Sequence, residues 1–121
     1  MKHALVSILL VACLLVAHTA AARAVYAVAI GNNQPPSADP SLQVLRYADD
    51  DAARFYDLFA HFARRVELLT VLDAKSQTRY PGLAAAARPP TLWQLRNTLN
   101  EFRQQIQIDA QRGEETALYL S

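Results

Sequence analysis

The sequence predicts an α/β fold in which a mostly parallel sheet is flanked by helices. Three short apolar runs, at 25–30, 66–72 and 116–120, have the length and the β-favouring residues of buried strands. Two longer segments, opening at Asp49 and at Thr91, repeat their apolar residues at helical spacing. The order β-α-β-α-β predicts a parallel sheet with right-handed crossovers.

The first segment, residues 1–24, has the features of a secretory signal peptide. A short basic start precedes an apolar stretch from Ala4 to Ala17, and Ala22-Arg23-Ala24 offers small residues to a signal peptidase. The stretch is shorter than the ~20 residues of a membrane-spanning helix. We therefore expect an exported protein, periplasmic or secreted, that meets the membrane only through this segment. The alternatives are an uncleaved anchor and lipidation at Cys13, where Leu10-Val11-Ala12-Cys13 resembles a lipoprotein cleavage box.

Composition excludes several classes of site. The 121 residues include twelve basic and eleven acidic side chains, and this net charge of +1 gives no electrostatic case for nucleic acid binding. The three glycines are too few and too widely spaced for a phosphate-binding loop. Removal of residues 1–24 leaves ten basic and eleven acidic residues, no cysteine, and His61 as the one histidine. A cysteine nucleophile and a multi-histidine metal site are thus excluded from 25–121, and we expect no cofactor.

The first strand, Val25–Ile30, is apolar on both faces, which predicts a place in the middle of the sheet. Gly31 ends the strand, and Asn32–Pro40, with three prolines, is predicted to be a loop. Asn32 and Asn33 follow the carboxyl end of a strand, where binding sites form. They either shape a substrate cleft or form a turn that tolerates left-handed geometry.

The first helix is predicted to open at Asp49-Asp50-Asp51, because carboxylates favour the positive end of a helix dipole. A calcium or acid–base cluster is the alternative, but consecutive helix residues point about 100° apart and do not converge on one ion. His61 is expected on the solvated face rather than as a catalytic base, and Arg64-Arg65 as a charged helix end. The spacing predicts an inward face made of Phe55, Phe59 and Phe62, widened by Tyr56, Leu58 and Ala63.

The second half of the chain is predicted to hold a strand at Val66–Leu72 and then a long, mobile connection over Asp73–Pro90. Thr91 and Gln94 have the spacing of a capping box for a second helix, and Gly113 is its predicted stop. The predicted inward face of this helix is Leu92, Leu95, Leu99, Phe102 and Ile106.

Trp93, in the first turn of the second helix, is expected to pack on the sheet rather than to form a ligand platform. The third strand, Thr116–Leu120, runs almost to the end of the sequence. Because a natural domain rarely stops inside an apolar strand, we expect the chain to be the N-terminal part of a longer protein.

Several segments, taken in order, resemble one known family. They are Ala29-Ile30-Gly31-Asn32-Asn33, Leu45 to Ala52, Val66-Glu67-Leu68-Leu69 with Asp73, Thr91, and Thr116 to Ser121. This series resembles the bacterial caspase-like cysteine peptidases, relatives of caspases and metacaspases, over most of residues 25–121. The resemblance implies a caspase-like three-layer sandwich. It also implies a catalytic histidine just past the third strand, in a Ser-Gly-His-Gly-type motif, and a nucleophilic cysteine just past the fourth.

The sequence ends at Ser121, where that histidine motif would begin, so no catalytic role passes to any residue of this chain. We expect residues 25–121 to be the N-terminal portion of a caspase-like domain in an exported cysteine endopeptidase, inactive alone. Its partner in the full-length protein would be a polypeptide substrate. The alternatives are a non-catalytic caspase-like binding or regulatory module and an unrelated exported α/β binding domain.

Overall fold

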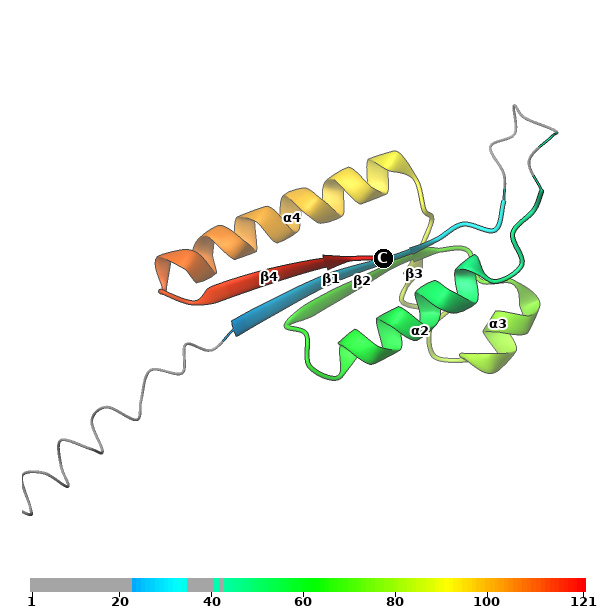
Figure 1. Ribbon diagram of the computed structural model, residues 1–121, viewed down its shortest axis with the longest axis horizontal. Helices are drawn as coiled ribbons and strands as arrows, with labels where there is room; N and C mark the ends of the chain where they lie inside the picture. The colour runs from blue at the N-terminus through cyan, green and yellow to red at the C-terminus, as the bar shows by residue number, and fades with distance from the viewer. Residues whose placement is uncertain (1–22, 35–40, 42) are drawn as a thin grey trace, which may run out of the picture.

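A computed structural model describes residues 23–34, 41 and 43–121. The sheet order is β3-β2-β1-β4, and all neighbouring strands are parallel (Figure 1). The predicted α/β fold with a parallel, helix-flanked sheet is thus confirmed. Its elements are β1 (Arg23–Gly31), α2 (Ala48–Ala60), β2 (Arg65–Thr70), α3 (Ala74–Arg79), β3 (Ala87–Arg88), α4 (Leu92–Gln111) and β4 (Glu115–Leu120).

β1 lies between β2 and β4, as its two apolar faces predict. It pairs with β2 over Tyr26–Gly31 and with β4 over Arg23–Val28. Because β1 begins at Arg23, the expected boundary between signal and domain at residue 24 falls inside the strand. The rest of the expected signal, residues 1–22, and residues 35–40 and 42 of the expected loop region lie outside the described residues.

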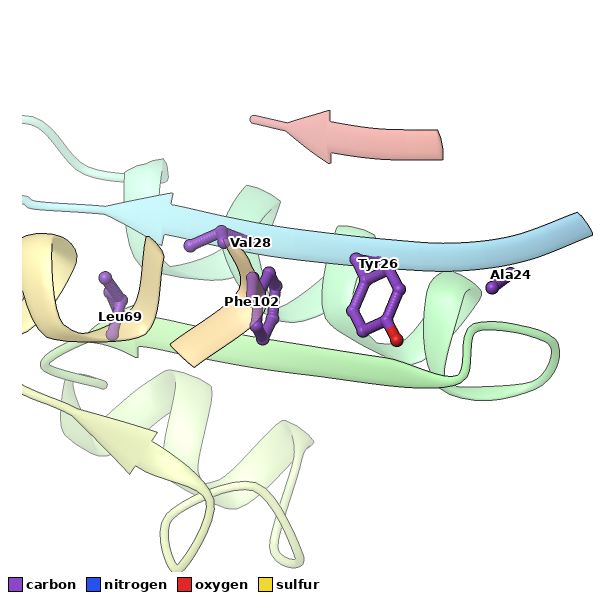
Figure 2. Packing of buried hydrophobic residues seen from close by; sticks show 5 residues of the cluster. All are labelled: Ala24, Tyr26, Val28, Leu69 and Phe102. Atoms are coloured by element: carbon purple, nitrogen blue, oxygen red, sulfur yellow. The ribbon is translucent and has the colours of Figure 1, made fainter. Parts of the chain in front are cut away.

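Helices cover both faces of the sheet, α4 on one and α2 with α3 on the other (Figure 1). Alternate residues of β1 point to opposite sides, as strand geometry requires. The side chains facing α4 form a buried cluster with Phe102 at its centre, and the rings of Tyr26 and Phe102 lie 5.3 Å apart (Figure 2). On the α2 side, Ala29, Ala52 and Leu68 form the second cluster. The members of the first cluster are Ala24, Tyr26, Val28, Leu69 and Phe102.

The start of α2 packs directly on the end of β1, and this contact requires a glycine. An ideal Cβ on Gly31 would lie 2.1 Å from the carbonyl oxygen of Ala48 and 2.8 Å from Cβ of Ala52. Such distances are far below van der Waals contact, so a side chain at Gly31 would push the helix from the strand. Small residues on both elements therefore set the distance between the sheet and α2.

The inward face of α2 is narrower than the sequence predicts. Phe59 is buried, Phe55 is half-buried, and their rings stack at 4.3 Å. The prediction is wrong for Phe62 and Leu58, whose exposed fractions are 56% and 60%. α2 ends at Ala60, so Phe62 lies in the turn beyond it, and Leu58 is offset by about 100° from Phe59.

The segment from Asp73 to Pro90 is not the long, mobile connection that the sequence predicts. It contains α3 and β3, and β3 is a short outer strand of the sheet that pairs with Leu68 and Leu69 of β2. Gln77 also donates from Nε2 to the carbonyl oxygen of Leu72 at 2.8 Å. Elements of six and two residues are too short to show a period in the sequence, which explains the error.

α4 begins and ends where the sequence predicts. The Thr91 hydroxyl accepts the backbone N–H of Gln94 at 3.1 Å, and Gly113, with a φ of +76°, follows the helix in the left-handed region. Leu92 and Trp93 are 64% and 69% exposed, so the prediction that they pack inward is wrong. Trp93 is nine residues from Phe102, which is two and a half helical turns, so the two side chains point to opposite sides of α4.

Candidate functional site

The carboxyl ends of β1, β2 and β4 meet at one edge of the sheet, where parallel α/β folds form their binding sites. β1 leads into the turn at Asn33, and β2 leads into Asp73. Beyond β4, Ser121 donates its N–H to Val28 at 3.1 Å and accepts the N–H of Ile30 at 2.8 Å. Ser121 therefore lies against β1 at this edge, which we call the carboxyl edge.

Asn33 joins the end of β1 to the start of α2. Its Oδ1 accepts the backbone N–H groups of Ala48 at 2.9 Å and Asp49 at 3.3 Å. These are amides that a helix cannot pair within itself, and the side chain of Tyr47 at the N-cap position makes no capping bond. Asn33 therefore caps α2 from sixteen residues away, a role that the sequence did not predict.

The turn interpretation for Asn32 and Asn33 is supported, but not the left-handed geometry. Asn32 Oδ1 accepts the N–H of Gln34 at 3.1 Å, which is an Asx-type turn. Among residues 23–34, 41 and 43–121, no residue other than glycine has a positive φ. Asn33 also borders a surface hollow described below, so the cleft interpretation keeps a structural basis.

Asp49 is fully buried and connects three elements. Its Oδ1 accepts Nδ2 of Asn33 at 2.6 Å, and its Oδ2 accepts the backbone N–H of Asp73 at 2.9 Å. Burial opposes ionisation, but the hydrogen bonds from the Asp73 backbone and the Asn33 side chain help to outweigh it, and the pKa of Asp49 is lowered. The carboxylate is therefore ionised at neutral pH, in the first turn of α2 where the helix dipole favours it.

Asp50 and Asp73 hold α3 against the start of α2. Asp73 caps α3 by accepting the N–H of Ser76 at 2.8 Å. Asp50 accepts the buried Ser76 hydroxyl at 3.0 Å and pairs with Arg79 at 3.1 Å. The three consecutive aspartates thus begin a helix, as predicted, and Asp49 and Asp50 bond to protein donors. Within the described residues, no three His, Cys, Asp or Glu side chains are placed to hold a metal ion.

A hollow of about 350 Å³ lies beside this network, and we call it the edge hollow. Asp50, one of its acidic residues, is paired with Arg79. Among the ion pairs of the described residues, none involves Arg46 or Lys75, the two other cationic residues of the lining. Such a surface suits a peptide that carries an acidic group. Its walls combine Val44, Leu45 and Tyr47 with three cationic residues, two acidic ones and two amides: Arg46, Lys75, Arg79, Asp50, Asp73, Asn33 and Gln34.

A second, smaller hollow of about 240 Å³ lies between the end of β2 and the turn that precedes β3. Its lining includes Thr70, Leu72 and Ala87 and is mainly apolar. The Thr70 hydroxyl, which is buried, has no hydrogen-bond partner among the described residues. The lining contains no charged side chain, so no base lies there to activate the Thr70 hydroxyl, and the hollow offers a small apolar contact surface.

At the opposite edge of the sheet, the amino edge, a second fully buried carboxylate belongs to Asp109 of α4. It accepts the Tyr26 hydroxyl, pairs with Arg64 at 2.7 Å and accepts Nε2 of Gln105 at 3.3 Å. The bond from Tyr26 lowers the pKa of Asp109 against the effect of burial, and burial raises the pKa of Tyr26. Asp109 follows Phe102 by seven residues, two helical turns, so helix periodicity could have revealed its inward position.

The interpretation of Arg64-Arg65 as a charged helix end is wrong, because α2 ends at Ala60. Arg64 bonds to Glu114 at 2.5 Å as well as to Asp109, and the bond with Glu114 raises its pKa. Arg65 pairs with Glu67 at 2.9 Å and with Glu101 at 2.5 Å. Its guanidinium also lies 5.3 Å from the centre of the Phe102 ring. The two arginines therefore tie the start of β2 to α4.

His61 is exposed, as predicted, and its Nδ1 lies 2.6 Å from the carbonyl oxygen of Asp57 on the same helix turn. It is the C-cap residue of α2, next to the amino edge and away from the network around Asp49. No cysteine occurs in the described residues. The part of the chain that the structure describes therefore brings together no thiol–imidazole pair.

No known family model matches the chain, and no curated protein or solved structure matches it. The fold and the carboxyl edge define the molecule as a parallel α/β protein with a polar network and a mixed apolar and cationic hollow at the edge where binding sites form. In the described ranges, no helix combines the length and the apolar composition needed to cross a membrane.

Proposed function

We propose that residues 25–121 are the first portion of a caspase-like domain in an exported cysteine endopeptidase. One observation carries the proposal: at the carboxyl edge, Ser121 beyond β4 lies against the end of β1, the strand that leads into the turn at Asn33. In the family that the sequence resembles, the catalytic histidine lies just past the strand that corresponds to β4. A group placed there would face the surface available to a substrate.

The chemistry of such a peptidase needs a thiolate that attacks the peptide carbonyl and an imidazole that protonates the leaving amine. Backbone N–H groups stabilise the oxyanion. Residues 25–121 contain no cysteine, and His61 is distant from the carboxyl edge, so the proposal requires both groups from another part of the polypeptide. The residues described here supply the scaffold and, in the edge hollow, a surface for the polypeptide substrate.

A non-catalytic binding or regulatory module is the second candidate. Arg46 and Lys75 on the edge hollow support it, because a peptide could bind there without reaction. Both candidates share the fold and the hollow. They differ in whether a thiol and an imidazole reach the carboxyl edge.

The test is made on the protein as its host exports it. The mass of the exported protein shows whether the polypeptide extends past Ser121. The protein is then incubated with a panel of basic-site and acidic-site peptides, with and without a thiol-blocking reagent. Thiol-sensitive cleavage by a longer polypeptide supports the peptidase. Peptide binding without cleavage favours the module. Thiol-sensitive cleavage by purified residues 25–121 alone would contradict the proposed mechanism, because that segment contains no cysteine.

A further inference from the structure

The position at which a signal peptide is removed must leave the mature fold intact, and β1 begins before the boundary that the sequence indicated. We propose that the chain is cleaved after Ala22, so that the exported protein begins at Arg23 instead of Val25. This inference rests on the proposed export. It concerns the site of signal-peptide cleavage and does not depend on whether the protein is a peptidase.

The pairing of β1 with β4 is the first argument. Arg23 lies opposite Glu115 and Ala24 lies opposite Thr116, and these are the first two pairs of the ladder. β4 is the last strand of the described sheet, and β1 is its one neighbour there. A chain that began at Val25 would leave Glu115 and Thr116 without a facing strand.

The core beneath α4 is the second argument. Ala24 is 2% exposed and belongs to the buried cluster of Tyr26, Val28 and Phe102 (Figure 2). Cleavage after Ala24 would remove this residue and open that end of the cluster to water. Cleavage after Ala22 removes no member of the cluster.

The charge of the new amino terminus is the third argument. Val25 is half-buried, and its carbonyl oxygen accepts the N–H of Arg64 at 2.8 Å. An ammonium group on Val25 would be partly removed from water, which is unfavourable for a charge. Arg23 is exposed, so its ammonium group stays hydrated.

The sequence offers a signal peptidase both positions. The enzyme requires small residues at the last position before the cut and two positions earlier. Ala20 and Ala22 satisfy this for cleavage after Ala22, as Ala22 and Ala24 do for cleavage after Ala24. The sequence alone therefore does not decide between them, whereas the extent of β1 favours the first.

The test is to express the complete chain in a bacterial host and to determine the amino terminus of the exported protein by intact mass and N-terminal sequencing. We expect Arg23 as the first residue. Two matched variants separate the positions, because each blocks one of them alone. Ala20→Leu should abolish cleavage after Ala22, so that no product begins at Arg23, whereas Ala24→Val should leave the amino terminus at Arg23.

Four results would count against this inference, and only the last of them also overturns the proposed export. An amino terminus at Val25 in the unsubstituted protein overturns the proposed position and leaves the proposed export intact. Processing that survives Ala20→Leu but stops with Ala24→Val does the same. An amino terminus at any other residue does the same. A protein that stays in the cytoplasm with Met1 present overturns the export, and the inference with it.

Discussion

The two edges of the sheet each hold one fully buried carboxylate, and the two are stabilised by different kinds of donor. At the carboxyl edge, Asp49 accepts the side-chain amide of Asn33 and the backbone N–H of Asp73, both uncharged. At the amino edge, Asp109 is bound by a hydroxyl and by the guanidinium of Arg64. The amino edge therefore neutralises its buried charge with an ion pair, whereas the carboxyl edge solvates its charge with dipoles.

The two carboxylates therefore hold neighbouring elements together in different ways. At the amino edge, Asp109 connects α4 to β1 through Tyr26 and to the residue before β2 through Arg64. Neither of the two hollows lies at this edge. At the carboxyl edge, uncharged donors stabilise the charge of Asp49 instead, and one carboxylate connects the turn after β1, the start of α2 and the residue that caps α3. The comparison predicts that removing the carboxylate at the carboxyl edge disrupts more of the fold than removing a single donor at the amino edge.

The largest effect is expected for Asp49→Ala. Two charge-assisted hydrogen bonds are lost, each worth roughly 1.5–3 kcal/mol, so the free energy of unfolding should fall by about 3 kcal/mol or more. Urea unfolding followed by circular dichroism measures the loss. Asp51→Ala is the control, because Asp51 is exposed on the same helix turn and should change stability by less than about 0.5 kcal/mol. Equal losses for the two variants would show that the network around Asp49 contributes nothing.

Next in size is Gly31→Ala, which tests the close contact between β1 and α2 at the same edge. The added Cβ would lie 2.1 Å from the carbonyl oxygen of Ala48, and overpacking of this kind costs roughly 1–3 kcal/mol. Gly82→Ala is the matched control, since no atom lies within 4 Å of its Cβ position. A Gly31→Ala variant as stable as Gly82→Ala would mean that α2 can move from the sheet without cost.

A smaller effect is expected at the amino edge for Tyr26→Phe, which removes one donor and leaves Arg64 on the carboxylate. Loss of a hydrogen bond to a charged group should lower the free energy of unfolding by about 1.5 kcal/mol. Tyr80→Phe serves as the control, because the Tyr80 hydroxyl meets Arg54 at 3.3 Å on the surface. If Tyr26→Phe cost more than Asp49→Ala, the proposed contrast between the two edges would be wrong.

The smallest effect expected at neutral pH comes from protonation of the two buried carboxylates, because Asp49 and Asp109 are both ionised there. It becomes visible in the free energy of unfolding only at acid pH. The folded protein lowers the pKa of Asp49 and of Asp109 below the 3.8 of a free aspartate. Their stabilising contribution is therefore complete above about pH 5, and it is lost as the pH falls through 3.8 toward the lower folded values. Acid unfolding of Asp49→Asn and Tyr26→Phe measures this contribution.

Both variants should lose less stability than the parent protein between neutral pH and pH 3. Asp49→Asn removes one of the two titrating groups, and Tyr26→Phe removes the bond that lowers the pKa of the other. A dependence on pH that is unchanged in Asp49→Asn would mean that the carboxyl group at this position has an ordinary pKa in the folded protein.

The sequence was sufficient for the three long strands of the sheet, because each of them carries its own signal. Val25–Ile30 is apolar on both faces, and the structure places it between β2 and β4. The capping pattern at Thr91 and the stop at Gly113 are also local, and both are confirmed. Burial on two faces and capping depend on neighbouring residues, so they can be recognised without a structure.

The parts that could not be predicted depend on positions far apart in the chain. Asn33 and Asp49 are separated by 16 residues, and Tyr26 and Asp109 by 83, so neither bond leaves a local pattern. A periodic apolar stripe also does not show where a helix ends, which is why Phe62 was placed inward. The hydrogen-bond networks at both edges therefore could not be predicted from the sequence and required the structure.

The exposure of Trp93 has a practical consequence for spectroscopy. It is the one tryptophan of the chain, 69% exposed in the first turn of α4, whose N-terminal end lies toward the carboxyl edge. Its indole emission should already resemble that of a hydrated chromophore in the native protein, so unfolding will change its wavelength little. A polypeptide that covers this surface would shift the emission to the blue, which gives the molecule a built-in optical reporter of occupancy.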